Sequence, residues 1–266
     1  MSLFDWQLFA DAESFLQGRL NELLGKNSFA LEQAREIQRS TSTNIFDWVD
    51  HLVLPIETVN VEELMEMGFE GSQKSNGDGS VFRVRGSTLF PLVLKSGKGS
   101  EVALIVEDME DFRKTLGKER TVEGEPNSSF RKLSLVGEND FIFSFVERRG
   151  SSGYSVDDTG NVDSYIEALS TLESRKRRFE SSEEGIYETE KLLKNFENKL
   201  SKLRLADAFF RAERRYWETR SRATKIQKSR QDKVGLGWGN VDHHTFRSSR
   251  GNFAALIRLF DYLGLE

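Results

Sequence analysis

The hydrophobic pattern of the chain changes twice along its length, and this change constrains the fold more than any other feature. Residues 4–40 carry apolar side chains three and four positions apart, which is the spacing of amphipathic helices. Between residues 48 and 148 the apolar residues form short runs bounded by turn residues, which is typical of strands. Helical spacing returns from about residue 160. A sheet-forming middle region flanked by helices predicts an α+β protein.

The middle region contains enough short apolar runs for one mixed sheet and two short helices. The runs expected to form strands are residues 48–54, 81–95 (as one strand or two), 102–106, 132–136 and 141–148, the last two as a hairpin. Helical spacing predicts helices at residues 61–67 and 109–116.

The region after residue 150 is expected to be mainly helical. Ser181 lies three residues before Glu184, which fits a helix capping box, and apolar residues continue from there at helical spacing. These features predict one long helix or coiled-coil arm over residues 182–230. The glycine-rich segment 235–239 is interpreted as a flexible joint, after which the pattern returns to a strand and a helix.

These patterns divide the chain into four segments. Residues 1–44 form an N-terminal helical segment, 45–150 an α/β domain, 151–234 the helical arm, and 235–266 a strand and a helix. A lone strand and helix cannot cover their apolar faces. Three arrangements stay open for the last segment: it completes the sheet begun at residue 48, it pairs with a second chain, or the sequence is a fragment of a longer protein.

Composition excludes several classes of protein. The 266 residues include no cysteine, which excludes disulfides, thiolate metal sites, iron–sulfur clusters and a cysteine nucleophile. No run of about 18 apolar residues is present, so we expect no membrane span. Residues 1–6 lack the basic region of a signal peptide, and we expect a cytoplasmic protein. The net charge of −5 argues against a generally basic nucleic-acid binder.

Two segments of the chain share one pattern. Each opens with aspartate and histidine, continues into a strand-like run and a helix, and ends with glycine, an apolar residue and glutamate. The first runs from Asp50-His51 to Gly68-Phe69-Glu70, and the second from Asp242-His243 to Gly264-Leu265-Glu266.

The opening of the first segment resembles that of vicinal-oxygen-chelate proteins, the superfamily of glyoxalases and extradiol dioxygenases. The resemblance implies paired βαβββ modules and a metal-binding histidine in the opening strand, at the position of His51. Residues 101–108 are similar to the opening strand of the second module, with Glu101 where that module carries histidine. The expected fold is therefore a βαβββ-type mixed sheet with N-terminal helices and a long helical arm. The resemblance covers residues 45–170, and 238–266 through the second segment.

Residues 143–166 are also similar to the C-terminal region of 4-hydroxyphenylpyruvate dioxygenases, a branch of the same superfamily. Both have a phenylalanine-rich strand, then Arg-x-Gly, then Gly-Asn before a helix. In this alignment the metal-binding glutamate of the family falls on Ser144, which cannot replace it. Glu147 lies three residues later, and strand alternation turns it to the face opposite Ser144.

The resemblance implies a divalent metal cofactor such as iron(II), manganese or zinc. The predicted ligands are His51, His243, Glu101 and Glu147. In the alternative interpretation, His51 is a buried histidine with satisfied hydrogen bonds, and the His243-His244 pair caps a strand. Asp50 precedes His51, but neighbouring side chains of a strand point to opposite faces. Sequence alone therefore does not place the Asp50 carboxylate beside the ring.

Three arginines are candidates for substrate binding. Arg83 and Arg85 share one face of a predicted strand, and Arg247 follows the histidine pair. Guanidinium groups beside a metal site would clamp a carboxylate or phosphate of a substrate. The alternative is a solvated strand face, since charged residues are mostly exposed.

The stretch 211–233 is the most basic part of the chain. It contains nine lysines and arginines against three acidic residues, with Tyr216 and Trp217 among them. Such a stretch would bind nucleic-acid phosphates, or form an exposed helix face that pairs with the acidic remainder. Because that remainder is acidic, we expect no nucleic-acid partner.

Two functions stay open at this stage. One is a metal-dependent enzyme of the vicinal-oxygen-chelate kind that acts on a small oxygenated substrate. The other is a non-enzymatic binding or oligomerisation module, because fold does not fix function. In both cases we expect a homo-oligomer, and in the second the helical arm mediates association.

Overall fold

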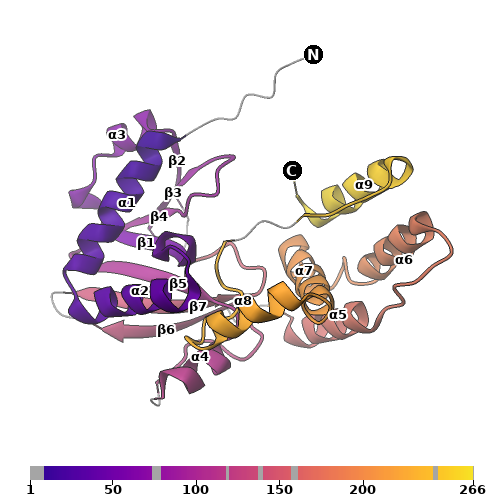
Figure 1. Cartoon of the computed structure of the whole chain (residues 1–266). Coiled ribbons are helices and arrows are strands. Elements are labelled where there is room, and N and C mark those ends of the chain that lie inside the picture. The colour runs from indigo at the N-terminus through magenta and orange to yellow at the C-terminus, as the bar shows by residue number, and fades with distance from the viewer. Residues whose placement is uncertain are drawn as a thin grey trace. The chain divides into compact units, whose positions relative to one another are not determined.

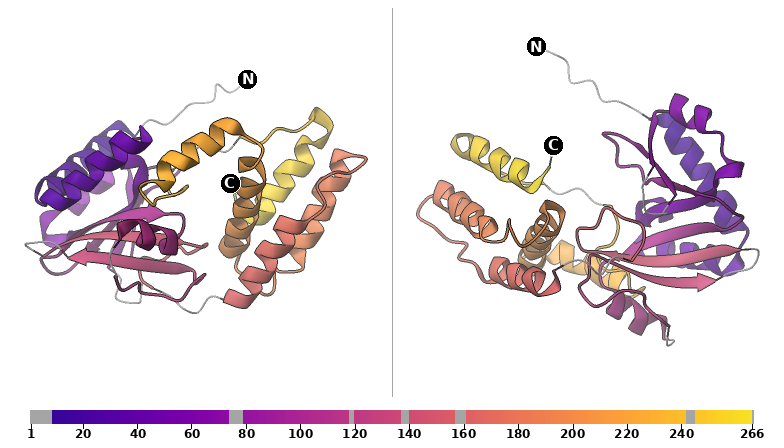
Figure 2. Two further views of the ribbon diagram at one scale, coloured as in Figure 1. Left: turned by 60° about the horizontal axis from the view of Figure 1, so that its bottom comes forward. Right: turned by 180° about the vertical axis from the view of Figure 1, so that it is seen from behind.

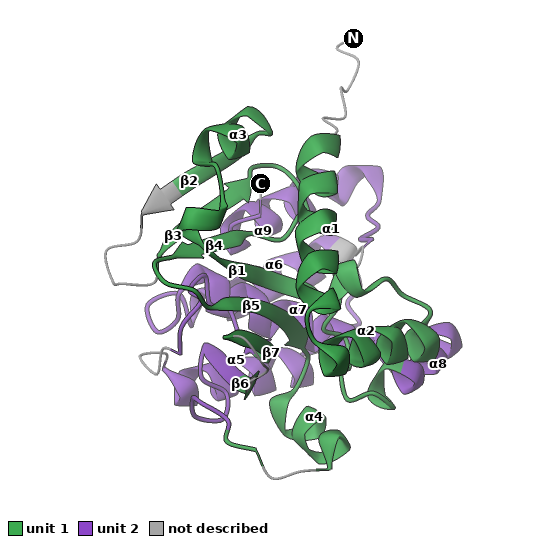
Figure 3. Ribbon diagram, turned by 90° about the vertical axis from the view of Figure 1, so that its left-hand side faces the viewer, with its two compact units in different colours: residues 1–121, 133–146, 231–241 green, residues 122–132, 147–230, 242–266 purple. Residues whose placement is uncertain are grey.

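The chain is a mixed α+β protein with a seven-stranded sheet, which confirms the predicted fold class (Figure 1). The computed structural model describes residues 9–73, 79–117, 120–136, 140–156, 161–241 and 245–265. Two compact units make up the chain (Figure 3). The first comprises residues 1–121, 133–146 and 231–241, and the second residues 122–132, 147–230 and 242–266.

The sheet contains both parallel and antiparallel neighbours. Its strands are β1 (Val49–Pro55), β2 (Phe69–Gln73), β3 (Ser80–Val84), β4 (Leu92–Lys95), β5 (Ser100–Val106), β6 (Phe130–Val136) and β7 (Phe141–Arg148). They lie in the order β2-β3-β4-β1-β5-β7-β6. β1 is parallel to β4 and antiparallel to β5, and β3 is antiparallel to both β2 and β4. The strands expected from the apolar runs are confirmed, with residues 81–95 forming two.

The first four strands follow a βαβββ order along the chain. Helix α3 (Val61–Glu66) connects β1 to β2, and β3 and β4 follow without another helix. β5 is likewise followed by a helix, α4 (Met109–Leu116), before β6 and β7. Both helices begin at a side-chain cap, since Asn60 accepts a hydrogen bond from Glu62 N and Asp108 accepts two from the first turn.

Helices cover one face of the sheet in the first unit. α1 (Ala10–Gly25) and α2 (Ser28–Thr41) run across this face in Figure 3. The ring of Phe29 in α2 lies edge-on to Phe143 in β7, and Phe112 in α4 contacts Phe145 with 4.1 Å between ring centroids. Because side chains alternate along a strand, Ser144 belongs to the opposite face.

The second unit is built around four helices that share a hydrophobic core. These are α5 (Val162–Ser174), α6 (Ser182–Lys194), α7 (Lys202–Glu218) and α9 (Phe253–Leu263), which lie together in both views of Figure 2. Helix α8 (Arg222–Asp232) follows α7. The core includes Tyr165, Leu172, Leu193, Phe209 and Leu259, each at most 3% exposed.

The predicted helical arm over residues 182–230 is wrong, because this stretch forms three separate helices. After Lys194 the chain turns so that Phe196 and Leu200 enter the hydrophobic core. Ser201 then caps α7 by accepting a hydrogen bond from Arg204 N, and Ser221 accepts one from Thr224 N in the first turn of α8. Spacing alone did not show these breaks, since apolar positions on successive helices kept an approximate three–four rhythm.

The structure describes part of the segment expected to form a strand near residue 242. Residues 242–244, which include His243 and His244, lie outside the described residues. Residues 245–249 form no strand. The helix expected after them is confirmed as α9, and Gly264 ends it in the left-handed conformation with φ of 83°. None of the described helices is long and apolar enough to cross a membrane.

Candidate functional site

His51 lies in β1 with its ring held by the preceding residue. The Nδ1 atom of His51 is 2.6 Å from Oδ2 of Asp50, and the two side chains are 1% and 6% exposed. The pairing of β1 with β5 shifts register between Val49 and His51. This bulge adds a residue to β1, which breaks the alternation and explains how adjacent side chains meet. The expectation that alternation separates Asp50 from His51 is therefore corrected.

His51 and Glu101 project from the same face of the sheet. In the register of β1 and β5, His51 is opposite Ala103 and Val53 is opposite Glu101. Directly opposed residues share a face, as do residues two apart on one strand. His51 and Glu101 are thus diagonal neighbours, and such residues lie about 7–8 Å apart in an antiparallel pair, with their Cβ atoms somewhat closer. The imidazole and the carboxylate therefore extend from neighbouring positions of this face.

Ser144 of β7 completes this group on the third adjacent strand. Its hydroxyl donates a hydrogen bond to Oε1 of Glu101, so Ser144 shares the face of His51 and Glu101. All three residues are buried, at 1% exposure for His51, 5% for Glu101 and 0% for Ser144. The three positions that the family resemblance marked as ligand positions therefore converge on one buried face, opposite the helix-covered face.

The donor set fits part of a divalent metal site. An imidazole nitrogen and a carboxylate oxygen are suitable ligands for zinc, manganese or iron(II). With Nδ1 engaged by Asp50, Nε2 is the nitrogen that would bind the ion, in the carboxylate–histidine–metal arrangement common in proteins. Within the described ranges, however, no group of three or more potential ligand side chains is close enough to hold a metal ion. His243 lies outside these ranges and remains a predicted ligand.

The segment 235–239 is packed closely against β5, which corrects its interpretation as a flexible joint. A Cβ on Gly237 would overlap Glu107, and one on Gly239 would overlap the Ile105 carbonyl. Glu107 donates its backbone N–H to Leu236 O and accepts a hydrogen bond from Trp238 N through Oε2. The glycines are needed because the backbone of this segment approaches β5 and Glu107 closely. Close approach is, besides conformational freedom, a common reason for a glycine-rich segment.

Glu147, the other predicted oxygen ligand, is engaged differently. It lies three residues beyond Ser144 on β7, on the opposite face of the strand. In the second unit its carboxylate pairs with Nη1 of Arg131 at 3.4 Å and with Nη2 of Arg149 at 3.0 Å. All three side chains are at most 5% exposed. Two guanidinium groups neutralise this buried carboxylate, so Glu101 is the better candidate for a metal ligand.

A buried polar network in the second unit was not anticipated from the sequence. The Tyr165 hydroxyl donates to Oδ2 of Asp207 at 2.5 Å, and the Arg204 guanidinium lies 4.2 Å from the centre of the Tyr165 ring. Arg204 also donates to the backbone carbonyls of Arg149 and Asn127, at 2.9 and 3.0 Å. The hydrogen-bonded pairs of this network are 42 to 77 residues apart in sequence, so no local pattern signals the network.

This network gives the second unit a predicted alkaline pH dependence. Burial and the charge of Asp207 raise the pKa of Tyr165 from its ordinary value of 10 to about 12. The folded state therefore favours the neutral phenol, and its stabilisation is complete below pH 10 and lost as pH rises from 10 to 12. We expect about 2–3 kcal/mol of unfolding free energy to disappear over this window.

Urea unfolding of wild type and Tyr165→Phe at pH 9 and pH 11.5 tests this prediction. Groups other than Tyr165 titrate in both proteins, so their effects cancel in the comparison. The wild type should lose more stability than the variant between the two pH values. An equal loss in both proteins would show that the Tyr165 phenol is not the responsible group.

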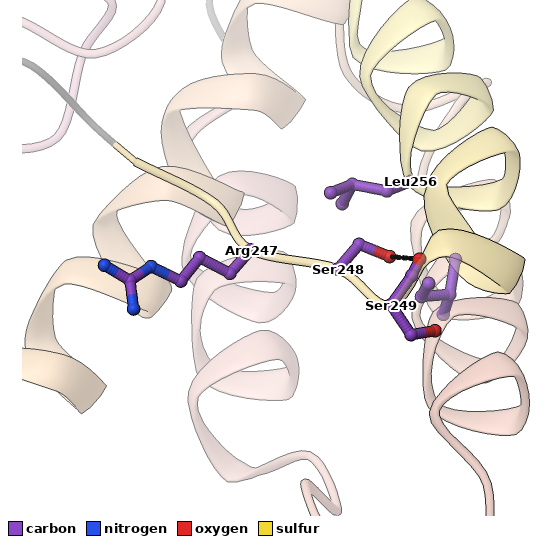
Figure 4. A pocket seen from close by; sticks show the side chains of 5 residues that line it. Arg247, Ser248, Ser249 and Leu256 are labelled. Atoms are coloured by element: carbon purple, nitrogen blue, oxygen red, sulfur yellow. Dashed lines mark hydrogen bonds between the residues drawn. The ribbon is translucent and has the colours of Figure 1, made fainter.

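The three predicted substrate-binding arginines are divided between the two units of the chain. Arg83 is exposed on β3, where it lies opposite Glu70 of β2, and Arg85 is exposed just after β3. This arrangement agrees with a solvated strand face. Arg247 belongs to the second unit and lines a pocket of about 430 Å³ with Ile186, Ser248, Ser249 and Leu256. Figure 4 shows the Arg247 guanidinium extended away from Ser248 and Leu256.

Comparison with known proteins adds no identification. No protein-family model matches the chain, and no curated protein matches it.

Proposed function

We propose that the chain is a metal-dependent enzyme of the vicinal-oxygen-chelate kind, which acts on a small oxygenated substrate. The observation that carries the proposal is the shared buried face of His51 and Glu101 on adjacent strands. The order of elements supports the same assignment. β1 to β4 follow a βαβββ order, and β5, which lies beside β1, begins a similar series of strand, helix and strands.

The residues of the face have distinct roles in this proposal. His51 binds the cation through Nε2, Glu101 binds it through a carboxylate oxygen, and Asp50 fixes the orientation of the imidazole. A bound divalent ion would supply Lewis-acid stabilisation of negative charge on a carbonyl, diol or carboxylate substrate. His243 is the proposed further ligand. The low-dielectric face excludes water, which strengthens the electrostatic interactions of Glu101 and Asp50.

The Glu101 carboxylate is the decisive group for a test. We expect metal-depleted wild-type protein to take up about one equivalent of manganese, zinc or iron(II), measured by elemental analysis after gel filtration. Glu101→Gln keeps the shape and a hydrogen-bond acceptor for Ser144 but removes the charge, and should lower affinity at least tenfold. Glu66→Gln, at an exposed position on α3, is the matched control and should bind like wild type.

The Ser144 hydroxyl also favours a second candidate function. A hydrogen bond from Ser144 satisfies one oxygen of Glu101 without a metal ion, as expected in a module that has lost its cation. In that case the domain is a binding or oligomerisation module, and neither wild type nor Glu101→Gln takes up metal. Sedimentation of the same samples would then show whether the chain self-associates.

A further inference from the structure

The surface formed by α8 and the end of α7 has an unusual charge distribution. Arg222, Lys225 and Arg230 are exposed on α8, and no carboxylate in the described part of the chain lies within ion-pair distance of them. Other cations of the same unit are paired, as in Arg215 of α7 with Glu173 and Lys199, between α6 and α7, with Glu167. The three α8 cations are therefore available to an external anion.

The three cations lie along one side of the helix. Around the helix axis Arg222 lies between Lys225 and Arg230, and the three positions span an arc of about 140° at 100° per residue. The distance from Arg222 to Arg230 along the axis is about 12 Å at 1.5 Å per residue. Ile226, 48% exposed, is the one large apolar side chain on this face. The face is thus a row of positive charges with little apolar area.

Aromatic side chains lie at the end of α7, immediately before this row. Trp217 is 59% exposed. Its ring forms a T-shaped contact with the Tyr216 ring, with 5.1 Å between the ring centroids. The guanidinium groups of Arg177 and Arg220 lie over the Tyr216 ring, at 3.9 and 3.5 Å from its centre. These contacts hold Tyr216 in place and leave much of the Trp217 indole open to solvent.

We propose that this surface, defined by Trp217, Arg222, Lys225 and Arg230, binds single-stranded nucleic acid. The three cations contact successive phosphates of one strand, and the Trp217 ring stacks on a base. This site is separate from the metal site proposed above. The net charge of −5 does not prevent it, because salt screens charges beyond about 8–10 Å. An anionic membrane is a poorer partner, since an interfacial helix needs a broad apolar face.

The test is fluorescence anisotropy with a labelled 12-nucleotide single strand, titrated with the intact protein at several salt concentrations. We expect measurable binding at low salt, weakened as salt rises. Arg222→Gln/Lys225→Gln/Arg230→Gln should weaken binding at least tenfold and reduce the slope of log K against log salt by about 2, because three phosphate contacts are lost. Trp217→Ala should weaken binding about fivefold or more with an unchanged slope.

A second triple variant, Lys191→Gln/Lys194→Gln/Lys199→Gln, removes the same charge from exposed positions elsewhere in the second unit. It should bind like wild type, and circular dichroism confirms that each variant is folded. Equal weakening by both triple variants would overturn the proposal, because the effect would then be one of net charge. Absence of binding by wild type would also overturn it. A third result would also overturn it. In that result the wild type binds phosphatidylserine vesicles but not the oligonucleotide, and the α8 triple variant abolishes the vesicle binding.

Discussion

Replacement of Gly150 by alanine is expected to destabilise the second unit by about 3–5 kcal/mol. Gly150 has φ of 77°, where a side chain costs about 1–2 kcal/mol. A Cβ at this position would also overlap the Leu203 carbonyl oxygen and the backbone of Arg204. These atoms belong to the start of α7, so the helix must move away. Such a movement breaks the hydrogen bonds from Arg204 to Arg149 O and Asn127 O.

Gly264→Ala provides the control for Gly150→Ala within the same unit. Gly264 also has positive φ, at 83°, but the nearest atom to its Cβ would be Lys202 Cδ at an ordinary 3.8 Å. Alanine here should cost only the conformational term of about 1–2 kcal/mol. The measurement is urea unfolding followed by circular dichroism at 222 nm. If both variants lose the same stability, the close approach of Gly150 to α7 is not what requires glycine.

The sequence predicted those helices and strands whose formation depends on residues close together in the chain. Val102 to Val106 formed a strand because a short apolar run fits a strand buried on both faces. Asp108 and Ser181 began helices because their side chains cap free backbone N–H groups. These effects act over a few residues, so they can be recognised without knowing the partners of each segment.

The sequence singled out two residues of the proposed site, but it did not predict the geometry around them. The family resemblance marked His51 and Glu101, and a regular strand pairing then brought them to one face. The Asp50–His51 contact depends on a bulge in β1. The residue types of this strand do not reveal the bulge. The Tyr165–Asp207 contact joins two helices whose packing is decided by the whole core. Neither feature has a local signal.

Replacement of His51 by glutamine is expected to weaken divalent metal binding at the proposed site at least a hundredfold. The glutamine side chain removes the imidazole nitrogen that we propose as a ligand. Asp50→Asn should weaken binding about tenfold to a hundredfold, because an amide orients the ring less firmly and does not raise the basicity of the imidazole. Isothermal titration of metal-depleted proteins measures both effects.

The double variant separates an indirect role of Asp50 from a direct one. If Asp50 acts only through the His51 ring, Asp50→Asn should change metal affinity little in the His51→Gln background, so the two effects are not additive. If Asp50 itself binds the metal, its replacement should weaken binding similarly in both backgrounds. Additive losses would therefore refute the orienting role and make Asp50 a ligand. An unchanged affinity in His51→Gln alone would remove His51 from the site, and with it the basis for the proposed metal chemistry.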